Sequence, residues 1–400
     1  MKPISHRALG FPASPIRKLM PQATAAKARG LVVHHVNIGQ PDIPTPDTVL
    51  QAIRSYEPQT IAYAQSGGNP AYVDGIHRYY RSIGHDLRPG QVMATTGGSE
   101  AIIFAFLTAM DPGDEILVPE PFYTNYNTMA QVAGLTIRPI TTTGEDGFHL
   151  PSRETLEAAI TPQTKAILIC NPSNPTGTVY TRSEIDTLAD LAKAHDLWLI
   201  SDEVYREFVF EPRADDYRSI LEREDLAERT IVVDSVSKRF SMCGARLGAL
   251  VTRNDDIAAA ALRLGQARLS SSSLAQHVAR DAHDLPSEYY ASMIDEYRRR
   301  RDVVFEALSA ISGVSLVRPE GAFYTIPHLP VDDAERFARW LLTDFQVEGE
   351  TVMVAPAAGF YMTEGLGRQE IRIAFVLDVD RLRRSMGILR RALDVYPGAG

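Results

Sequence analysis

Lys238 is the side chain with the clearest capacity for covalent chemistry. It follows a short apolar run at residues 230–234, within the segment Ser235-Val-Ser-Lys238, and Arg246 comes eight residues later. A lysine whose pKa is lowered by burial or by nearby cations forms Schiff bases with carbonyl compounds. Hydroxyl groups and an arginine close to it suit a phosphate group. The segment therefore indicates a nucleophilic lysine beside a phosphate site.

Other polar and aromatic residues also stand directly after strand-like runs. The further residues in such positions are Gly97-Gly98-Ser99-Glu100, Tyr123, Asn174, Asp202, Tyr205 and, inside the apolar run 371–375, Arg372. Glycines that open a helix leave free N–H groups for an anion, and a carboxylate at the end of a buried strand needs a cationic partner. Each position also has an ordinary structural explanation, such as a turn, core packing or a solvent-facing side chain.

These residues together match the needs of one cofactor. Ligands of an open α/β sheet bind beyond the carboxyl ends of its strands, where these residues should meet. The set supplies a lysine for a Schiff base, a carboxylate for a pyridinium nitrogen, a ring for stacking and a phosphate cradle. This combination predicts a site for pyridoxal 5′-phosphate.

The elements that position these residues follow from alternating strand-like and helix-like segments. The predicted strands are 92–95, 115–119, 135–140, 165–170, 197–201, 230–234 and 247–252. They are short, apolar and often β-branched, as in a buried parallel sheet. Thr181-Arg-Ser-Glu184 forms a capping box that predicts the start of a helix. The fold class is therefore α/β, with a mainly parallel sheet sandwiched by helices.

The pattern changes toward the C-terminus, where a second, smaller α+β domain is expected. Its predicted strands are 314–317, 322–326 and 371–375, followed by a terminal helix at 380–395. We therefore divide the chain into an N-terminal arm and helix (1–40), a large cofactor-binding domain (41–280) and a small C-terminal domain (281–400). The arm is expected to pack with the small domain or with a partner subunit.

Composition narrows the class of protein further. The chain has 400 residues, 44% of them hydrophobic, and a net charge of −9, which disfavours a broad nucleic-acid surface. Two cysteines exclude a disulfide scaffold, and no cysteine or histidine spacing suggests a metal site. The N-terminus has no signal-peptide core, and no apolar stretch reaches the ~20 residues of a membrane span. A cytoplasmic protein is expected.

Several motifs extend over nearly the whole chain. They are Ser14-Pro-Ile-Arg17, Asn37-Ile-Gly39-Gln-Pro-Asp42, Asn174-Pro-Thr-Gly177, Asp202-Glu-Val-Tyr205, Ser235-x-Ser-Lys238-x-x-x-Met242-x-Gly244-x-Arg246-x-Gly248 and Ile371-Arg372-Ile. With these motifs the sequence resembles the class I/II aminotransferases, which are fold-type I pyridoxal phosphate enzymes, and within them the aspartate/aromatic aminotransferase branch. Ala245 departs from the pattern, since relatives often have Trp or Leu there.

The resemblance implies a role for each matching residue. Lys238 would form the internal aldimine and then shuttle a proton, and Asp202 would pair with the ring nitrogen. Tyr205 and Asn174 would bind the phenolate oxygen, and Tyr123 would stack on the ring. The phosphate would be surrounded by Gly98, Ser99, Glu100, Ser235 and Arg246. Gly39 and Arg372 would hold the substrate carboxylate, and Tyr63 would reach the phosphate of the other subunit in a homodimer.

The implied reaction is a ping-pong transfer of the amino group of an L-amino acid to a 2-oxo acid, with aspartate/glutamate or aromatic donors. A C–S β-lyase, or another elimination or cyclopropane-forming enzyme, would use the same cofactor residues. An aminotransferase-like sensor of a transcription regulator is disfavoured, because the match begins near residue 14 and leaves no room for a DNA-binding domain. The residues proposed to read the substrate side chain are Arg17, Arg263, Arg268, Phe11, Phe360 and Tyr361.

Overall fold

Seven short apolar segments pair into one sheet with the strand order β2-β8-β7-β6-β5-β3-β4. The computed structural model describes residues 3–210 and 216–398. The strands of this sheet are β2 (Val92–Thr95), β3 (Glu115–Glu120), β4 (Thr136–Thr141), β5 (Thr164–Cys170), β6 (Trp198–Asp202), β7 (Thr230–Ser235) and β8 (Gly248–Thr252). Each predicted strand of the sheet is confirmed, and its ends differ from the prediction by at most one residue.

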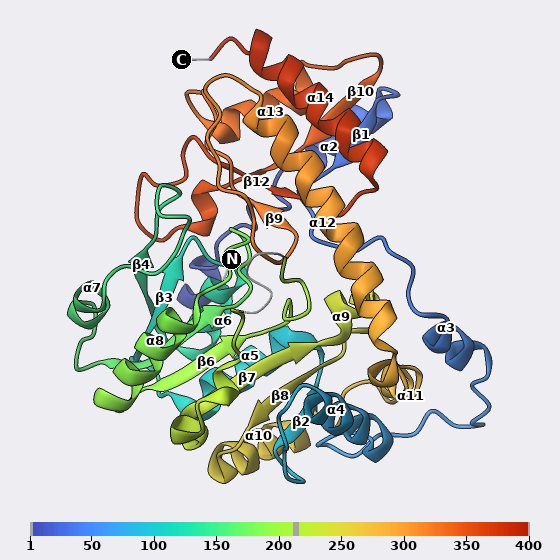
Figure 1. The fold of residues 1–400 in the computed structure, drawn as a ribbon, viewed down its shortest axis with the longest axis vertical. Coiled ribbons are helices and arrows are strands. Elements are labelled where there is room, and N and C mark those ends of the chain that lie inside the picture. Colours follow the sequence, from blue (N-terminus) through green and yellow to red (C-terminus); the bar gives the residue numbers. More distant parts are fainter. Residues whose placement is uncertain (1–2, 211–215, 399–400) are drawn as a thin grey trace.

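Helices cover both faces of this sheet, which is therefore the middle of three layers (Figure 1). They are α5 (Gly97–Ala109), α6 (Asn125–Ala133) and α10 (Asp255–Ala267) on one face, and α4 (Pro70–Ser82), α7 (Arg153–Ala158) and α8 (Arg182–Ala194) on the other. Successive side chains of a strand serve opposite faces: Val233 packs with the first group of helices and Val232 with the second. Strands buried on both faces need apolar residues at every position, which explains their continuous apolar sequences.

The direction of β8 determines which residues lie together at one edge of the sheet. Neighbouring strands run parallel, but β8 is antiparallel to both β2 and β7. The residues that precede β8 therefore lie beside the residues that follow β2 and β7. Because of this reversal, Arg246 comes to the same edge as Gly97, Gly98 and Ser235.

Two smaller sheets form a second layered body, which we call the small lobe (Figure 1). β1 (Val32–His35) pairs in parallel with β10 (Glu350–Met353), and β12 (Ile371–Ala374) lies between β11 (Ala355–Pro356) and β9 (Tyr324–Thr325). The helices of the small lobe are α2 (Met20–Ala28), α13 (Ala334–Thr343) and α14 (Val379–Val395). The predicted strand at 314–317 is wrong, since only one isolated bridge joins Ser315 to His328.

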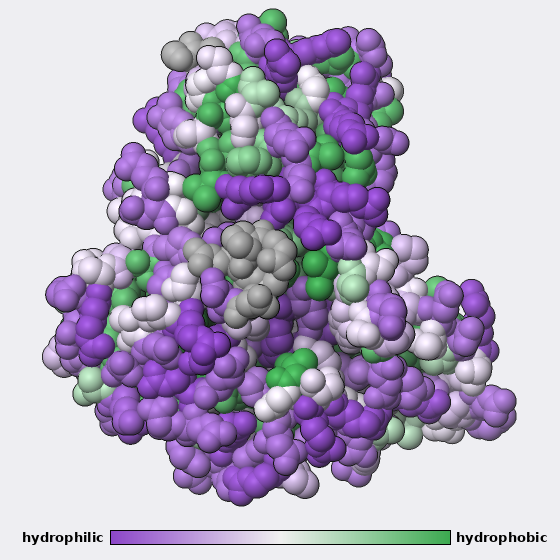
Figure 2. Space-filling model, viewed as in Figure 1, coloured by the Kyte–Doolittle hydropathy of each residue, from purple (hydrophilic) through white to green (hydrophobic). Residues whose placement is uncertain are grey.

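The long helix α12 (Ser287–Ser309) runs from the large sheet's body to the small lobe (Figure 1). The remaining α-helices are α1 (His6–Leu9), α3 (Asp47–Arg54), α9 (Val236–Arg239) and α11 (Ser273–Ala279). The face drawn in Figure 2 is mostly hydrophilic. Among the described residues, no helix has the length and apolar character that crossing a membrane requires.

A histidine links the two bodies. The predicted capping box at the start of α8 is confirmed, and the Glu184 carboxylate that accepts from Thr181 N–H also lies 3.0 Å from Nδ1 of His149. Nε2 of His149 is 3.4 Å from the carboxylate of Glu320, which precedes β9 of the small lobe. Hydrogen bonds to Glu184 and Glu320 raise the pKa of His149 to about 9. The imidazolium therefore bridges two carboxylates across the contact between the lobes.

Candidate active site

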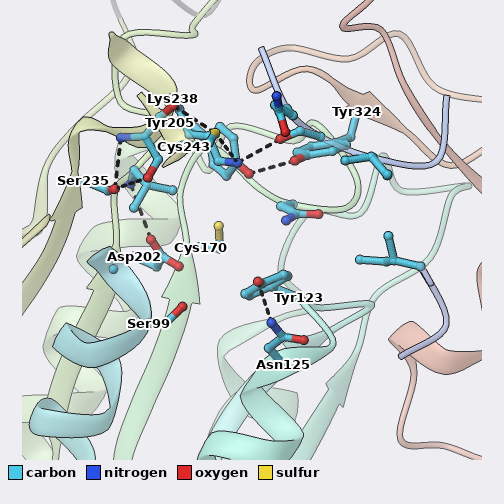
Figure 3. Close-up of a pocket in the computed structure, with 18 of the residues that line it drawn as sticks. Ser99, Tyr123, Asn125, Cys170, Asp202, Tyr205, Ser235, Lys238, Cys243 and Tyr324 are labelled. Atoms are coloured by element: carbon cyan, nitrogen blue, oxygen red, sulfur yellow. Dashed lines mark hydrogen bonds between the residues drawn. The ribbon is translucent and has the colours of Figure 1, made fainter. Parts of the chain in front are cut away.

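A cavity of about 520 Å³ lies where the carboxyl edge of the large sheet meets the small lobe. Side chains from several elements point into it (Figure 3). The predicted site residues that line it are Gly39, Gly98, Ser99, Tyr123, Asn174, Asp202, Tyr205, Ser235, Lys238, Arg246 and Arg372. The fold thus brings together residues that the sequence separates by more than three hundred positions.

Lys238 projects into the cavity from α9, directly after β7. Its Nζ donates a hydrogen bond to the Gly39 carbonyl at 2.8 Å and lies 3.9 Å from Sγ of Cys243. Loss of solvent around the amine lowers its pKa, and the positive charges of Arg372 and Arg246 lower it further. A lower pKa increases the share of neutral amine, which is the nucleophilic form.

Asp202 ends β6 with its carboxylate facing the cavity. Its Oδ2 accepts a hydrogen bond from the Tyr126 hydroxyl at 2.7 Å, and its Oδ1 accepts a longer one from Val204 N–H at 3.4 Å. Burial raises the pKa of Asp202 to about 6, although the Tyr126 hydrogen bond opposes that rise. A buried carboxylate of this kind is stabilised by a cationic hydrogen-bond donor placed against it.

Small and polar residues line the part of the cavity formed by α5, the end of β7 and the segment before β8. Gly97 has a φ of +75°, and a Cβ there would lie 2.6 Å from Nη2 of Arg246, so the guanidinium occupies the space of a missing side chain. Ser235 Oγ accepts from Ser237 N–H at 3.1 Å, and Ser99 lies in the first turn of α5. An arginine, hydroxyls and the free N–H groups of a helix start form a phosphate-binding arrangement.

Arg372 lies on β12, with 1% of its surface exposed. Its Nη1 donates to Oδ1 of Asn174 at 3.0 Å and its Nη2 donates to the Asn37 carbonyl at 2.6 Å. Its buried Nε has no hydrogen-bond partner within the part of the chain that the structure describes. Burial lowers the pKa of this guanidinium, which makes an anionic ligand favourable. A carboxylate fits its planar fork.

Tyr123 and Tyr205 supply rings and hydroxyls to the same space. The Tyr123 hydroxyl accepts from Nδ2 of Asn125 at 2.7 Å. The Tyr205 hydroxyl lies 2.9 Å from the hydroxyl of Tyr324. Both tyrosines therefore have hydroxyl groups held in fixed positions in the cavity wall.

Four of the predicted residues, Tyr63, Glu100, Arg263 and Arg268, lie outside the cavity lining. Tyr63 is 79% exposed on the surface of the chain. The Glu100 carboxylate accepts from Thr96 N–H at 2.7 Å and pairs with Arg268 at 3.1 Å, so both its charge and that of Arg268 are used within the protein. Arg263 is exposed on α10. Of the three arginines considered for the substrate side chain, Arg17 alone lines the cavity.

The aromatic residues considered for the substrate side chain do not line the cavity either. Phe360 is fully buried, with its ring 5.0 Å from the Arg372 guanidinium, and the Tyr361 hydroxyl donates to Glu370 at 2.7 Å. Phe11 is 40% exposed. Phe360 therefore packs against Arg372, and Tyr361 is held by Glu370.

Sequence reasoning missed Tyr126, Tyr324 and Cys243 as parts of the site. Tyr126 stands three residues after Tyr123 at the start of α6, and that helical spacing was an available signal. Tyr324 falls in a predicted strand but has no motif of its own. Cys243 is half-buried and lines the cavity beside Lys238, but the sequence around it carries no signal for such a role.

The cavity residues could hold pyridoxal 5′-phosphate. Lys238, Asp202 and Arg372 form no ion pair within the described residues, although all three are charged or chargeable and turned toward one space. An aldehyde would complement Lys238, a ring N–H would complement Asp202, and a carboxylate would complement Arg372. No group of three or more metal-binding side chains occurs among residues 3–210 and 216–398.

Comparisons with known proteins agree with this arrangement. The family model described as aminotransferase class I and II matches residues 33–386. The chain is 31% identical to the aspartate/prephenate aminotransferase of Thermus thermophilus, over 98% of this chain and 99% of that one. It is 30% identical to the aspartate aminotransferase of Bacillus subtilis, over 94% and 95%. The crystal structure of the Thermotoga maritima aspartate aminotransferase superposes with a TM-score of 0.89 at 30% identity, covering 98% of this chain and 100% of that one.

Proposed function

The chain belongs to the class I and II aminotransferase family and is an aminotransferase, and from this premise we propose that its cavity binds pyridoxal 5′-phosphate and takes an acidic L-amino acid as amino donor. The observation that carries the proposal is the meeting of Lys238, Asp202 and Arg372, without ion pairs among the described residues, in one cavity. Charged groups in such a place are costly unless a ligand complements them.

The cofactor, when bound, supplies an aldehyde for the amino group and an electron sink for the reaction. Asp202 would hold the positive charge on the ring nitrogen, and Tyr205 and Asn174 would donate hydrogen bonds to the ring oxygen. Gly98, Ser99, Ser235 and Arg246 would bind the phosphate. The neutral Nζ of Lys238 would take the proton from the substrate Cα and pass it to the cofactor.

Arg372 binds and orients the substrate. Its guanidinium would donate hydrogen bonds to the α-carboxylate, and the Gly39 backbone would contact the other side of that carboxylate. A substrate held by its carboxylate would present its Cα–H bond to Lys238 in one orientation. The reacting groups then need not find this orientation by diffusion, which lowers the entropic cost of the reaction.

Arg17 supports the choice of an acidic donor. It lines the cavity, and its side chain makes no hydrogen bond or ion pair with any described residue. Its charge acts on Tyr123 and Arg372, which supports a position at the substrate end. A guanidinium there suits the distal carboxylate of aspartate or glutamate. Relatives that are aspartate and aspartate/prephenate aminotransferases support the same choice.

Single-turnover reactions test this proposal. The purified, cofactor-loaded protein is mixed with aspartate, glutamate or alanine, and the change in cofactor absorption is followed. A charge-assisted hydrogen bond contributes about 1.5–3 kcal/mol, so Arg17→Met should lower the rate constant kcat/KM for aspartate about 10- to 150-fold. Alanine, which has no distal carboxylate, should react at an unchanged rate.

The controls separate the cofactor from the side-chain pocket. Arg390→Met removes an exposed arginine of α14, outside the cavity and outside α10, and should leave the reactions of both substrates unaffected. Equal losses for aspartate and alanine in Arg17→Met would show that Arg17 does not read the side chain. Protein that takes up no pyridoxal 5′-phosphate would contradict the cofactor proposal itself.

A second copy of the chain is part of the proposal. Exposed apolar and aromatic side chains gather where residues 61–67 pass over α10: Tyr63 is 79% exposed, Ile61 66% and Leu262 39%. A Cβ on Gly67 would lie 3.5 Å from Leu262, so this segment and the helix are in contact. A homodimer would cover this face and bring Tyr63 to the other cavity. Sedimentation should give a dimer mass, and Tyr63→Phe should weaken cofactor binding.

A further inference from the structure

Tyr324 is buried in the cavity wall and touches three of the proposed site residues (Figure 3). It lies on β9 of the small lobe, with 2% of its surface exposed. Its hydroxyl is 2.9 Å from the Tyr205 hydroxyl, and its ring centre is 4.6 Å from the Arg372 guanidinium. A Cβ on Gly39 would overlap the same hydroxyl. One side chain thus joins residues from three distant parts of the sequence.

The contact between the Tyr324 and Tyr205 hydroxyl groups determines where the hydroxyl proton of Tyr205 points. Burial raises the pKa of both tyrosines, so each hydroxyl keeps its proton at neutral pH. A pair of hydroxyls shares one hydrogen bond, and either oxygen can be the donor. When an acceptor oxygen lies beside Tyr205 in the cavity, the favourable arrangement is that Tyr324 donates to Tyr205 and Tyr205 donates to that oxygen. Donors arranged in such a chain strengthen one another.

The contact with the Tyr324 ring holds the guanidinium of Arg372 in position. The face of an aromatic ring attracts a guanidinium electrostatically, most strongly where water is excluded. The Tyr324 ring therefore supports Arg372 from one side, while Asn174 and Asn37 accept hydrogen bonds from its Nη atoms. The hydroxyl of the same ring lies against Gly39, whose carbonyl accepts from Lys238.

We propose that Tyr324 is a positioning residue with two separable functions: its hydroxyl orients the proton of Tyr205 toward the cofactor's ring oxygen, and its ring holds Arg372 for the substrate carboxylate. This inference rests on the proposed function, because it requires a cofactor beside Tyr205 and a carboxylate at Arg372.

The first test measures absorption instead of turnover. The visible absorption of the cofactor-loaded protein is titrated against pH for Tyr205→Phe, Tyr324→Phe and the double variant. Loss of a donor to the ring oxygen should raise the midpoint of the titration. Cooperative strengthening is roughly 10–30% per hydrogen bond, so Tyr324→Phe should give about one-tenth to one-third of the shift in Tyr205→Phe. The double variant should shift no further than Tyr205→Phe alone.

The second test separates the ring from the hydroxyl. Tyr324→Phe keeps the ring and should leave KM for the amino acid nearly unchanged. Tyr324→Leu removes the ring and should raise KM about 2- to 30-fold, the range expected for a cation–π contact. Tyr297→Phe is the matched control, since it removes a buried tyrosine hydroxyl that has no partner among the described residues. Melting temperatures show whether each variant is folded.

Each outcome decides one part of the inference. A midpoint in Tyr324→Phe equal to that of wild type, with a clear shift in Tyr205→Phe, would overturn the role of the hydroxyl. Additive shifts in the double variant would overturn the path through Tyr205. Equal KM values for the Phe and Leu variants would overturn the role of the ring. A wild-type protein without a visible cofactor band would instead refute the proposed function on which both roles depend.

Discussion

The hydrogen bond from Tyr126 to Asp202 should control the pH at which the cavity accepts a cationic ring. The perturbation is Tyr126→Phe, which removes only the hydroxyl that donates to Oδ2 of Asp202 at 2.7 Å. Burial would then act on the carboxylate, opposed by one long backbone hydrogen bond from Val204 and by the positive charge of Lys238. The Asp202 pKa should therefore rise above its value of about 6.

The size of the rise follows from the type of bond. A hydrogen bond to a charged group contributes about 1.5–3 kcal/mol, and 1.36 kcal/mol corresponds to one pKa unit. The Asp202 pKa in Tyr126→Phe should thus lie about 1–2 units higher. Wild-type Asp202 is ionised above pH 6 and loses its charge as the pH falls through that value. At pH 7 the ionised fraction should be about nine-tenths in wild type and about one-tenth to one-half in the variant.

The assay is the affinity of the cofactor-free protein for pyridoxal 5′-phosphate between pH 5 and 9. The ratio of wild-type to variant affinity cancels the ionisation of the cofactor itself. That ratio should be about 10–100 below pH 5, about 2–10 at pH 7, and close to 1 above pH 9. Asp202→Asn should bind weakly and lack the pH-dependent step, while Tyr297→Phe should follow wild type.

A ratio that stays constant from pH 5 to 9 would refute this reasoning, because it would show that Tyr126 affects affinity without acting on the charge of Asp202. A step that moves to lower pH would contradict the direction of the hydrogen bond.

Three further outcomes are expected. Lys238→Ala should fold, yet lack both the visible band of the lysine-bound cofactor and all amino transfer; residual turnover would show that another group is the nucleophile. Gly39→Ala should raise KM strongly, because the new Cβ overlaps the hydroxyl of Tyr324; an unchanged KM would contradict the tight contact. His149→Gln should lower stability by about 2 kcal/mol at pH 7, because the histidine's folded pKa is about 9 and its unfolded value about 6.5. That contribution is complete below pH 6.5 and disappears as the pH rises through 9, so the melting temperatures of wild type and variant should converge there.

The central sheet was predictable because its strands are buried on both faces. Val232 and Val233 pack into different cores, so the run is apolar without interruption and its ends are sharp. The residues at those ends were also visible in the sequence, since Asp202 and Lys238 interrupt apolar surroundings. Their roles came from motifs, and the placement of both in one cavity agrees with those roles.

The small lobe and the supporting residues were harder to predict. β9 has two residues and β11 two, which is too short for a periodic pattern. The pairing of β1 with β10 joins opposite ends of the chain, and local sequence carries no signal for such a partner. Tyr126 and Tyr324 act through neighbours brought close only by folding. The sequence could not show which of Arg268 and Arg17 is available to a substrate. The structure distinguishes them, because Arg268 pairs with Glu100.

The parallel pairing of Val32 with Glu350 has a consequence for synthesis on the ribosome. At about 5–20 residues per second, the N-terminal strand waits roughly 15–60 seconds before its partner strand is made. The central strands can meet during that time, while β1, with the sequence Val-Val-His-His, remains without its partner strand, and an unpaired strand edge can pair with other chains. Gly39 and Arg372 reach the cavity only when both ends of the chain have come together. A nascent chain should therefore form its large sheet early and complete its active site last. A chain truncated before residue 350 should fold its large sheet but remain inactive.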